Sequence, residues 1–410
     1  MKKTLLVLQL MLSLLIGGAL QAQVENPGNA AKTGATDHAN NDIDNSVNNG
    51  LNKTEGAIKG LFKKKKKTDP ATTAKPATPA GGTATAATAG GDQTTASLTN
   101  YKNYDFVPGD KIIFQSDLAG ESVGEIPSQF TLTQGQMDVQ QEDGENVIHT
   151  PKGPGARFSP RMKDMQYLPD QFTIEFDFKD ELFGFDHLDI YFGDNDDADG
   201  QIKMIGGDNA SFSWSNGDVD APEGLDLSKP MTWHHIAIAI NKNAGKIYMD
   251  QYRFVNVNNL VGKANKIVFN VHGYEHSWIK NIRIAAGGID IYKEMTTDNK
   301  IVTHGILFDV NKSTIRPESM GTINSIYKLL QATPALKFEV DGHTDNTGDA
   351  AHNLTLSQQR ADAVKAQLVA MGIDASRLTT KGFGDTKPMG PNDTPENKAI
   401  NRRVEFVKIP

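Results

Sequence analysis

The chain has no cysteine among its 410 residues. Disulfide bonds are therefore excluded, and no cysteine is available in it for lipid attachment. Hydrophobic residues make up only 38% of the chain, which is low for a fully packed protein of this length and predicts a sizeable disordered part. Acidic side chains outnumber basic ones, so the net charge is −8. This balance argues against a general nucleic-acid binder.

Residues 1–22 have the form of a secretory signal peptide. Lys2 and Lys3 supply the basic start, residues 5–16 form an apolar run, and Ala22 fits the cleavage position. The apolar run is too short to span a membrane, and no second span follows in the sequence. We therefore expect an exported protein without a transmembrane segment in its mature form.

Residues 23–99 are polar and rich in small side chains, and Thr, Ala, Pro and Gly dominate residues 68–97. Such a composition cannot bury a core and predicts a flexible, low-complexity linker. Five consecutive lysines, from Lys63 to Lys67, interrupt this segment. We expect a solvated charge block there, and contact with anionic lipid or wall polymer is the alternative.

Residues 100–290 show the patterns of a β-sheet protein. Residues 172–178 alternate with a period of two, and residues 236–240 form an apolar run of strand length. Residues 246–250 and 254–257 read as the two strands of a hairpin. Many short strands, turn residues between them and no long helix predict an antiparallel β-sandwich.

Three motifs in this region stand in a recurring order: Trp-His-His-Ile-Ala-Ile at 233–238, Gly-Lys-Ile-Tyr-Met-Asp at 245–250 and Ile-Lys-Asn-Ile-Arg-Ile at 279–284. In this order the region resembles the laminin-G and concanavalin-like jelly-roll superfamily. The resemblance implies a jelly-roll fold. It does not specify a function, because that fold hosts lectins, glycosidases and plain adaptors. A glycan or protein ligand is expected for this domain.

Three acidic residues in this region could do chemistry. Glu175 and Asp177 point to the same face of their strand, and paired carboxylates facing a cleft can cleave a glycosidic bond. With Asp180 they resemble the Glu-x-Asp-x-x-Glu of one jelly-roll glycosidase family, although the last position is Asp here. A glycan-cleaving enzyme is therefore the rival hypothesis. The preferred interpretation is the solvent face of an amphipathic strand, with the intervening apolar side chains pointing inward.

An oxygen-rich loop follows at residues 194–200. Asn195, Asp197, Asp199 and Gly200 match the opening of a calcium-binding loop, but Gly206 stands where the bidentate glutamate is needed. A solvated acidic turn is therefore expected, and calcium is the weaker alternative.

Histidine and tryptophan offer two further candidates. His234 and His235 are neighbours in a strand and should face opposite sides, which is poor geometry for a shared metal. Trp214, Trp233 and Trp278 could form a platform for sugar stacking, but we expect them to be core residues.

From residue 297 to residue 410 strands and helices alternate. The expected strands are residues 301–308, 337–340, 377–382 and 404–409, and the expected helices are residues 317–331 and 354–371. The order is βαβαββ and predicts one α/β layer pair.

The second of these helices places an arginine on its core side. On a helical wheel Arg360 falls within the apolar stripe, and Asn353 lies on the same side. A cation there needs an anion. Asp345 precedes the helix, whose N-terminus adds N–H groups. The array therefore fits a ligand with an ammonium and a carboxylate on one carbon, and an internal Asp345–Arg360 salt bridge fits equally well.

Five motifs carry a second resemblance: Phe-Asp-Val-Asn-Lys-Ser at 308–313, Gly-His-Thr-Asp-Asn-Thr-Gly at 342–348, Asn-Leu-x-Leu-Ser-x-x-Arg-Ala at 353–361, Gly-x-Gly at 382–384 and Asn-Arg-Arg-Val-Glu at 401–405. In this order they resemble the OmpA-like peptidoglycan-binding domain, in the form of Bacteroidetes-type envelope proteins. The resemblance implies that the ligand is the diaminopimelate of the peptidoglycan stem peptide. Asp345 would meet its ammonium group and Arg360 its carboxylate. Thr344, Asp309 and Asn353 would line the same site, and Arg402 would support it.

The resemblance further implies a non-catalytic protein of the cell envelope, without a cofactor. It would be associated with the outer membrane on the periplasmic side and tether components there to the wall. The sequence departs from the family pattern in one place, since Asn397, Lys398 and Ala399 replace the usual Gly-Arg-Ala. The lost arginine puts a contact at the rim of the site in doubt. Whether Arg402 or Arg403 faces the site is left open by the sequence.

Overall fold

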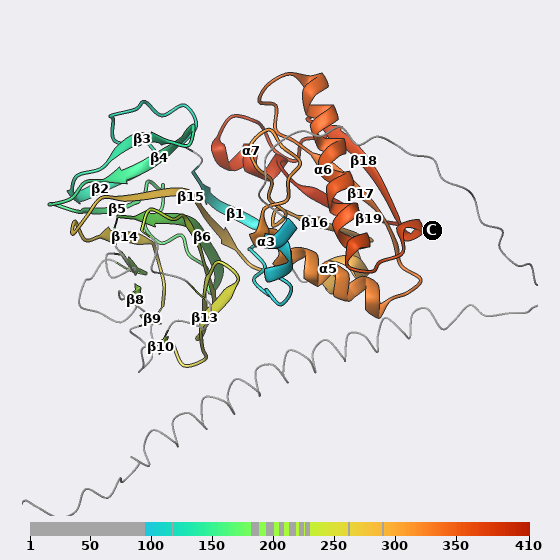
Figure 1. Cartoon of the computed structure of the whole chain (residues 1–410), viewed down its shortest axis with the longest axis horizontal. Helices are drawn as coiled ribbons and strands as arrows, with labels where there is room; N and C mark the ends of the chain where they lie inside the picture. Colours follow the sequence, from blue (N-terminus) through green and yellow to red (C-terminus); the bar gives the residue numbers. More distant parts are fainter. Residues whose placement is uncertain are drawn as a thin grey trace, which may run out of the picture. The chain divides into compact units, whose positions relative to one another are not determined.

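The computed structural model describes residues 95–116, 118–181, 188–193, 201–204, 209–212, 219–220, 225, 230–260, 263–288 and 291–410 (Figure 1). The predicted signal peptide, the lysine run, the acidic loop 194–200 and Trp214 lie outside these residues. The end of the predicted linker forms a short helix, α3 (Thr95–Asn100). No helix in the described part of the chain is long and apolar enough to cross a membrane.

The region after α3 is built from two antiparallel sheets. The first has eight strands in the order β13-β12-β11-β6-β15-β4-β3, and β1 also pairs with β15. Its strands are β1 (Lys111–Gln115), β3 (Asp138–Glu142), β4 (Glu145–Thr150), β6 (Gln171–Asp180), β11 (His234–Asn241), β12 (Ala244–Met249), β13 (Tyr252–Val257) and β15 (Ser277–Ala286). The predicted hairpin is confirmed, because β12 and β13 pair antiparallel.

The second sheet has seven strands in the order β10-β9-β8-β7-β14-β5-β2. Its strands are β2 (Phe130–Gly135), β5 (Ala156–Pro160), β7 (Leu188–Tyr191), β8 (Gln201–Met204), β9 (Asn209–Phe212), β10 (Val219–Asp220) and β14 (Val268–Val271). All strand pairs in the two sheets are antiparallel.

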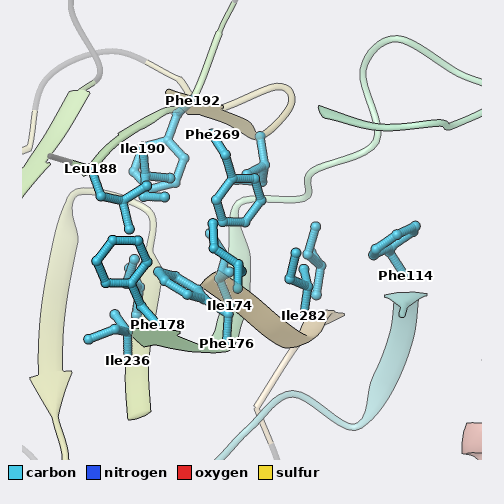
Figure 2. Close-up of a cluster of buried hydrophobic side chains, with 14 of the residues drawn as sticks. Phe114, Ile174, Phe176, Phe178, Leu188, Ile190, Phe192, Ile236, Phe269 and Ile282 are labelled. Atoms are coloured by element: carbon cyan, nitrogen blue, oxygen red, sulfur yellow. The ribbon is translucent and has the colours of Figure 1, made fainter. Parts of the chain in front are cut away.

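The two sheets share one hydrophobic core, part of which is drawn in Figure 2. Phe176 from β6 meets Phe269 from β14 edge to face, with ring centroids 5.4 Å apart. Ile174, Phe176 and Phe178 are all fully buried, as the alternation of this strand predicted. Each such side chain contributes about 1.5–3 kcal/mol through burial. We refer to residues 101–286 as the β-rich region.

The C-terminal part contains a four-stranded sheet in the order β16-β19-β17-β18. β17 and β18 are parallel, and the other two pairs are antiparallel. Its strands are β16 (Lys300–Thr303), β17 (Lys337–His343), β18 (Leu378–Gly384) and β19 (Val404–Ile409). Its helices are α4 (Ile291–Thr297), which precedes the sheet, η1 (Pro317–Ser319), α5 (Met320–Ala332), α6 (Ala350–Ala370), η2 (Ala375–Arg377) and α7 (Pro395–Asn401).

The predicted order of strands and helices holds with two differences. The first strand ends at Thr303 rather than at Phe308, which forms only an isolated bridge with Ile315. The short helix α7 is inserted before the last strand. The wheel of the second long helix is confirmed, because Leu356, Val364 and Leu368 are buried.

Helix α6 lies directly on β17 and β18 because glycines leave room for its backbone. A Cβ added to Gly342 would lie 2.2 Å from the carbonyl oxygen of Ser357, and one added to Gly382 would lie 2.4 Å from the nitrogen of Gln358. Side chains of the helix also bind the strand. The N–H of Gly382 donates to Gln358 Oε1 and that of Gly384 donates to Ser357 Oγ, both at 2.8 Å. This contact fixes α6 against the end of β17, where Asp345 follows.

Replacing Gly342 by alanine should destabilise the protein by about 1–3 kcal/mol or more, because the new Cβ meets backbone that cannot rotate away. Urea unfolding of the full chain would report the loss as a lower midpoint. Gly390→Ala is the matched control, since its Cβ would lie 3.4 Å from the nearest neighbour, Asn397 Oδ1. Equal midpoints for the two variants would contradict the role given to Gly342.

Candidate functional site

Asp345 lies in the loop that joins β17 to α6. Its side chain is buried and accepts two hydrogen bonds. Arg402 Nη1 donates to Oδ2 at 2.6 Å, and the N–H of Thr347 donates to Oδ1 at 2.9 Å. Burial raises the pKa of Asp345, but these hydrogen bonds outweigh it, so the pKa lies below its ordinary value. The carboxylate is therefore charged at neutral pH and retains lone pairs for a further donor.

Arg360 projects from α6 and is half-buried. Its Nε donates to the carbonyl of Lys312 at 3.0 Å and its Nη2 to the carbonyl of Asp309 at 3.3 Å. The guanidinium carbon also lies 4.9 Å from the centre of the Phe308 ring. Burial lowers the pKa of Arg360 to about 10, with the charge of Arg402 acting in the same direction and that of Asp345 opposing. The guanidinium remains charged at neutral pH.

The internal salt bridge between Asp345 and Arg360, which the spacing left open, is not formed. Among the described residues Asp345 pairs with Arg402, while the acceptors of Arg360 are backbone carbonyls. Neutral acceptors satisfy the N–H groups of a guanidinium but not its charge. Arg360 thus keeps a positive charge beside a carboxylate that is already engaged.

Three other predicted residues surround this pair. Asn353 donates from Nδ2 to the carbonyls of Asp345 and Thr347, at 3.3 and 3.1 Å, and so holds the loop in shape. The Thr344 hydroxyl is buried and has no hydrogen-bond partner. Asp309 contributes its carbonyl to Arg360, while its carboxylate lies 3.5 Å from Lys312 Nζ.

The two arginines before β19 contact different partners in the structure. Arg402 is the C-cap of α7 and turns to Asp345. Arg403 turns away and donates from Nε to Glu405 Oε1 at 2.7 Å and from Nη2 to the carbonyl of Lys387 at 3.0 Å. At the position where the family pattern has its arginine, Lys398 lies in the last turn of α7.

Sequence reasoning missed the backbone carbonyls of Asp309 and Lys312 as partners of Arg360. Backbone acceptors carry no residue-type signal, so only the fold could reveal them. The completed array has an anion at Asp345, an unneutralised cation at Arg360 and a buried hydroxyl at Thr344. Such an array can bind a small group that carries one ammonium and one carboxylate.

The three candidate carboxylates of the β-rich region are buried. Glu175 and Asp177 are only 4% and 5% exposed, so the predicted solvent face of this strand is wrong. Asp177 Oδ2 accepts from Arg316 Nη2 at 3.1 Å and from Asn281 Nδ2 at 2.6 Å. His235 Nδ1 lies 2.8 Å from Asp177 Oδ1.

Glu175 also pairs with a cation inside the protein, because its Oε2 lies 3.6 Å from Nη1 of the buried Arg283. Asp180 is also buried and accepts from Ser277 Oγ at 3.3 Å. All three carboxylates are thus buried and contact other side chains of the protein. Their partners include Arg316, which belongs to the C-terminal part of the chain.

The other candidates in the β-rich region have structural partners. His234 Nδ1 lies 2.8 Å from Asp250 Oδ2, whereas His235 meets Asp177, so the two rings do face opposite sides. Trp278 is buried and Trp233 is half-buried. Lys179 Nζ lies 4.7 and 4.9 Å from the centres of these two rings, which cover a lysine rather than form an open platform.

Comparison with known proteins identifies a family for the C-terminal part. Residues 307–402 match the model of the OmpA family. The protein named "Probable lipoprotein YiaD" of Escherichia coli is 40% identical over 115 residues, which are 28% of this chain and 52% of that protein. "Peptidoglycan-binding protein ArfA" of Mycobacterium bovis is 37% identical over 109 residues, 27% of this chain and 33% of that protein.

Among solved structures, the peptidoglycan-associated lipoprotein from Burkholderia pseudomallei is 25% identical and aligns with a TM-score of 0.24, over 25% of this chain and 88% of that one. The chain thus spans about half the length, or less, of the two curated relatives. The matched residues contain Asp309, Thr344, Asp345, Asn353, Arg360 and Arg402. The C-terminal part of the chain is therefore an OmpA-family domain.

Proposed function

We propose that this is a non-catalytic cell-envelope protein that binds peptidoglycan noncovalently. Its OmpA-family domain takes the diaminopimelate of the stem peptide and so tethers outer-membrane or periplasmic components to the wall. The protein is associated with the outer membrane and works on its periplasmic side. The relative named for peptidoglycan binding supports this proposal.

The observation that carries the proposal is the unneutralised charge of Arg360. A half-buried guanidinium without an anion is costly, and a ligand carboxylate would remove that cost through a charge-assisted, bidentate pair. Asp345 would accept from the ligand ammonium with the lone pairs that Arg402 and Thr347 leave free. The free end of diaminopimelate carries these two groups on one carbon.

Arg402 and Asn353 act through Asp345 in this proposal. Arg402 keeps the Asp345 carboxylate charged and oriented, and Asn353 fixes the loop that carries it.

The β-rich region supplies a second binding function in this proposal. Its two antiparallel sheets with one core are compatible with the laminin-G and concanavalin-like jelly-roll superfamily. A glycan or protein would be its ligand, and the segment before it would set the reach between that ligand and the wall.

Sedimentation with purified sacculi tests the proposal. The full chain should sediment with diaminopimelate-containing sacculi, and Asp345→Ala and Arg360→Ala should each weaken binding by more than about 100-fold, because each leaves a charge unpaired in the complex. Analysis of the supernatant should find no released muropeptides if the protein does not cleave the wall.

Lys328→Ala is the matched control for Arg360→Ala. Lys328 is exposed on α5, so its loss removes the same charge without touching the site. Thermal unfolding of each variant would separate lost binding from lost structure. Wild type and both site variants sedimenting equally would overturn the proposal.

A further inference from the structure

A second cluster of ionisable side chains lies on the same sheet, apart from the Asp345 site. Asp341 and His343 are on β17, and Glu405 is on β19 directly opposite Asp341. The period of two puts these side chains on one face, while Phe338, Val340 and Gly342 face the helices. One ligand atom from each of the three residues can be chosen so that all lie within 4.8 Å of one another.

His343 is buried without a hydrogen-bond partner on either ring nitrogen. Its Nε2 lies 3.8 Å from Glu405 Oε1, which is too long for a hydrogen bond. Asp341 Oδ1 is likewise buried without a partner. Buried polar groups are nearly always satisfied, so the unpartnered ring nitrogens of His343 and the unpartnered oxygen of Asp341 indicate a missing partner.

The chemistry of these atoms suits a metal ion. The neutral imidazole of a histidine such as His343 offers a nitrogen lone pair to a metal ion. The His343 ring stacks on Phe383, with centroids 5.2 Å apart, which fixes the imidazole plane.

The cations near Glu405 orient this carboxylate rather than block it. Arg403 Nε lies 2.7 Å from Oε1, and Lys300 Nζ lies 3.0 Å from Oε2. Carboxylates that ligate metals are usually held by such outer hydrogen bonds, and each oxygen keeps a further lone pair.

We propose that Asp341, His343 and Glu405 form a binding site for a divalent transition-metal ion of the zinc type. One nitrogen and two carboxylate oxygens match the ligands that zinc accepts and leave a fourth position for water or another ligand. The imidazole argues against Ca²⁺ and Mg²⁺, which prefer oxygen ligands throughout. The site is independent of peptidoglycan recognition, because none of its ligands belongs to the Asp345–Arg360 array.

Zinc titration of the metal-free full chain by calorimetry tests this site. Wild type should bind one zinc ion that His343→Gln and Asp341→Asn each lose or bind at least about 10–100-fold more weakly. Saturating zinc should also raise the midpoint of thermal unfolding in the wild type and not in either variant. Titration with Mg²⁺ in place of zinc should give no such response.

His352→Gln is the matched control, because His352 is exposed on α6 and lies outside the cluster. This variant should bind zinc as the wild type does. Equal zinc binding by the wild type and His343→Gln, or none by the wild type, would overturn the proposal. Circular dichroism without metal would show that the variants are folded, so that loss of zinc binding is not loss of structure.

Discussion

Asp177→Ala is expected to destabilise the protein by about 3–5 kcal/mol. The substitution leaves Arg316 and His235 without the carboxylate that both contact in the structure. Removing one partner of a buried ion pair costs more than the pair contributes, and among the described residues Arg316 and His235 then keep only Glu318 and Glu175 as carboxylates within ion-pair distance. Urea unfolding of the full chain would measure the loss as a lower midpoint at an unchanged slope.

The pKa values of Asp177 and His235 are consistent with this expectation. Burial disfavours the charged form of both side chains. It is outweighed at Asp177 by Arg316 and His235, which hold its pKa below the ordinary value. At His235 burial is outweighed by the hydrogen bond to Asp177 and by the nearby carboxylate of Glu175, which raise the pKa to about 10. The two side chains are therefore charged together at neutral pH.

Asp105→Ala is the matched control for Asp177→Ala. Asp105 also meets two cations, Lys246 at 3.3 Å and Arg253 at 3.2 Å, but its side chain is 37% exposed. Water screens such a pair, so its loss should cost less than about 1 kcal/mol. If the two variants unfolded at the same urea concentration, the cluster around Asp177 would not be the internal, water-excluded network that the burial indicates.

The same cluster shows where the sequence ceased to be informative. The inward face of β6 followed from alternation, because hydrophobic burial leaves a local pattern. The outward face looked like a solvent face because its partners are distant in sequence. Arg283 lies opposite Glu175 on the neighbouring strand β15, and Arg316 follows only after a further strand. Periodicity carries no information about such long-range pairs.

The C-terminal domain was more predictable because its signals are local. The wheel placed Arg360 and Asn353 on the core side of α6 from spacing alone, and the structure buries Asn353 and half-buries Arg360. Helix α7 was missed because it has only seven residues, although Thr394 as N-cap and Pro395 in the first turn were readable signals. The sequence could not predict which arginine pairs with Asp345, because this depends on where α7 ends. The end of α7 directs the Arg402 side chain toward Asp345.

The chemistry proposed for Arg360 predicts how the protein should discriminate between stem peptides. Sacculi in which lysine replaces diaminopimelate should bind on the order of 100-fold more weakly. Lysine keeps an ammonium for Asp345 but lacks the side-chain carboxylate of diaminopimelate. The guanidinium of Arg360 would therefore be buried in the complex without an anion. Binding isotherms with soluble stem peptides of both kinds would measure the ratio directly.

Combining the Arg360→Gln substitution with the change of stem peptide gives a double-mutant cycle, which measures the coupling between Arg360 and the ligand carboxylate. If Arg360 reads the carboxylate, the variant should bind the two stem peptides with nearly equal, weak affinity, because the difference between them no longer meets a charged partner. A peptide with the carboxylate converted to an amide should behave as the lysine peptide does, since it has the shape of diaminopimelate without the charge. A wild type that binds all three peptides alike would place the recognition outside Arg360. A variant that still prefers diaminopimelate would assign the carboxylate to Arg402, the other cation at Asp345.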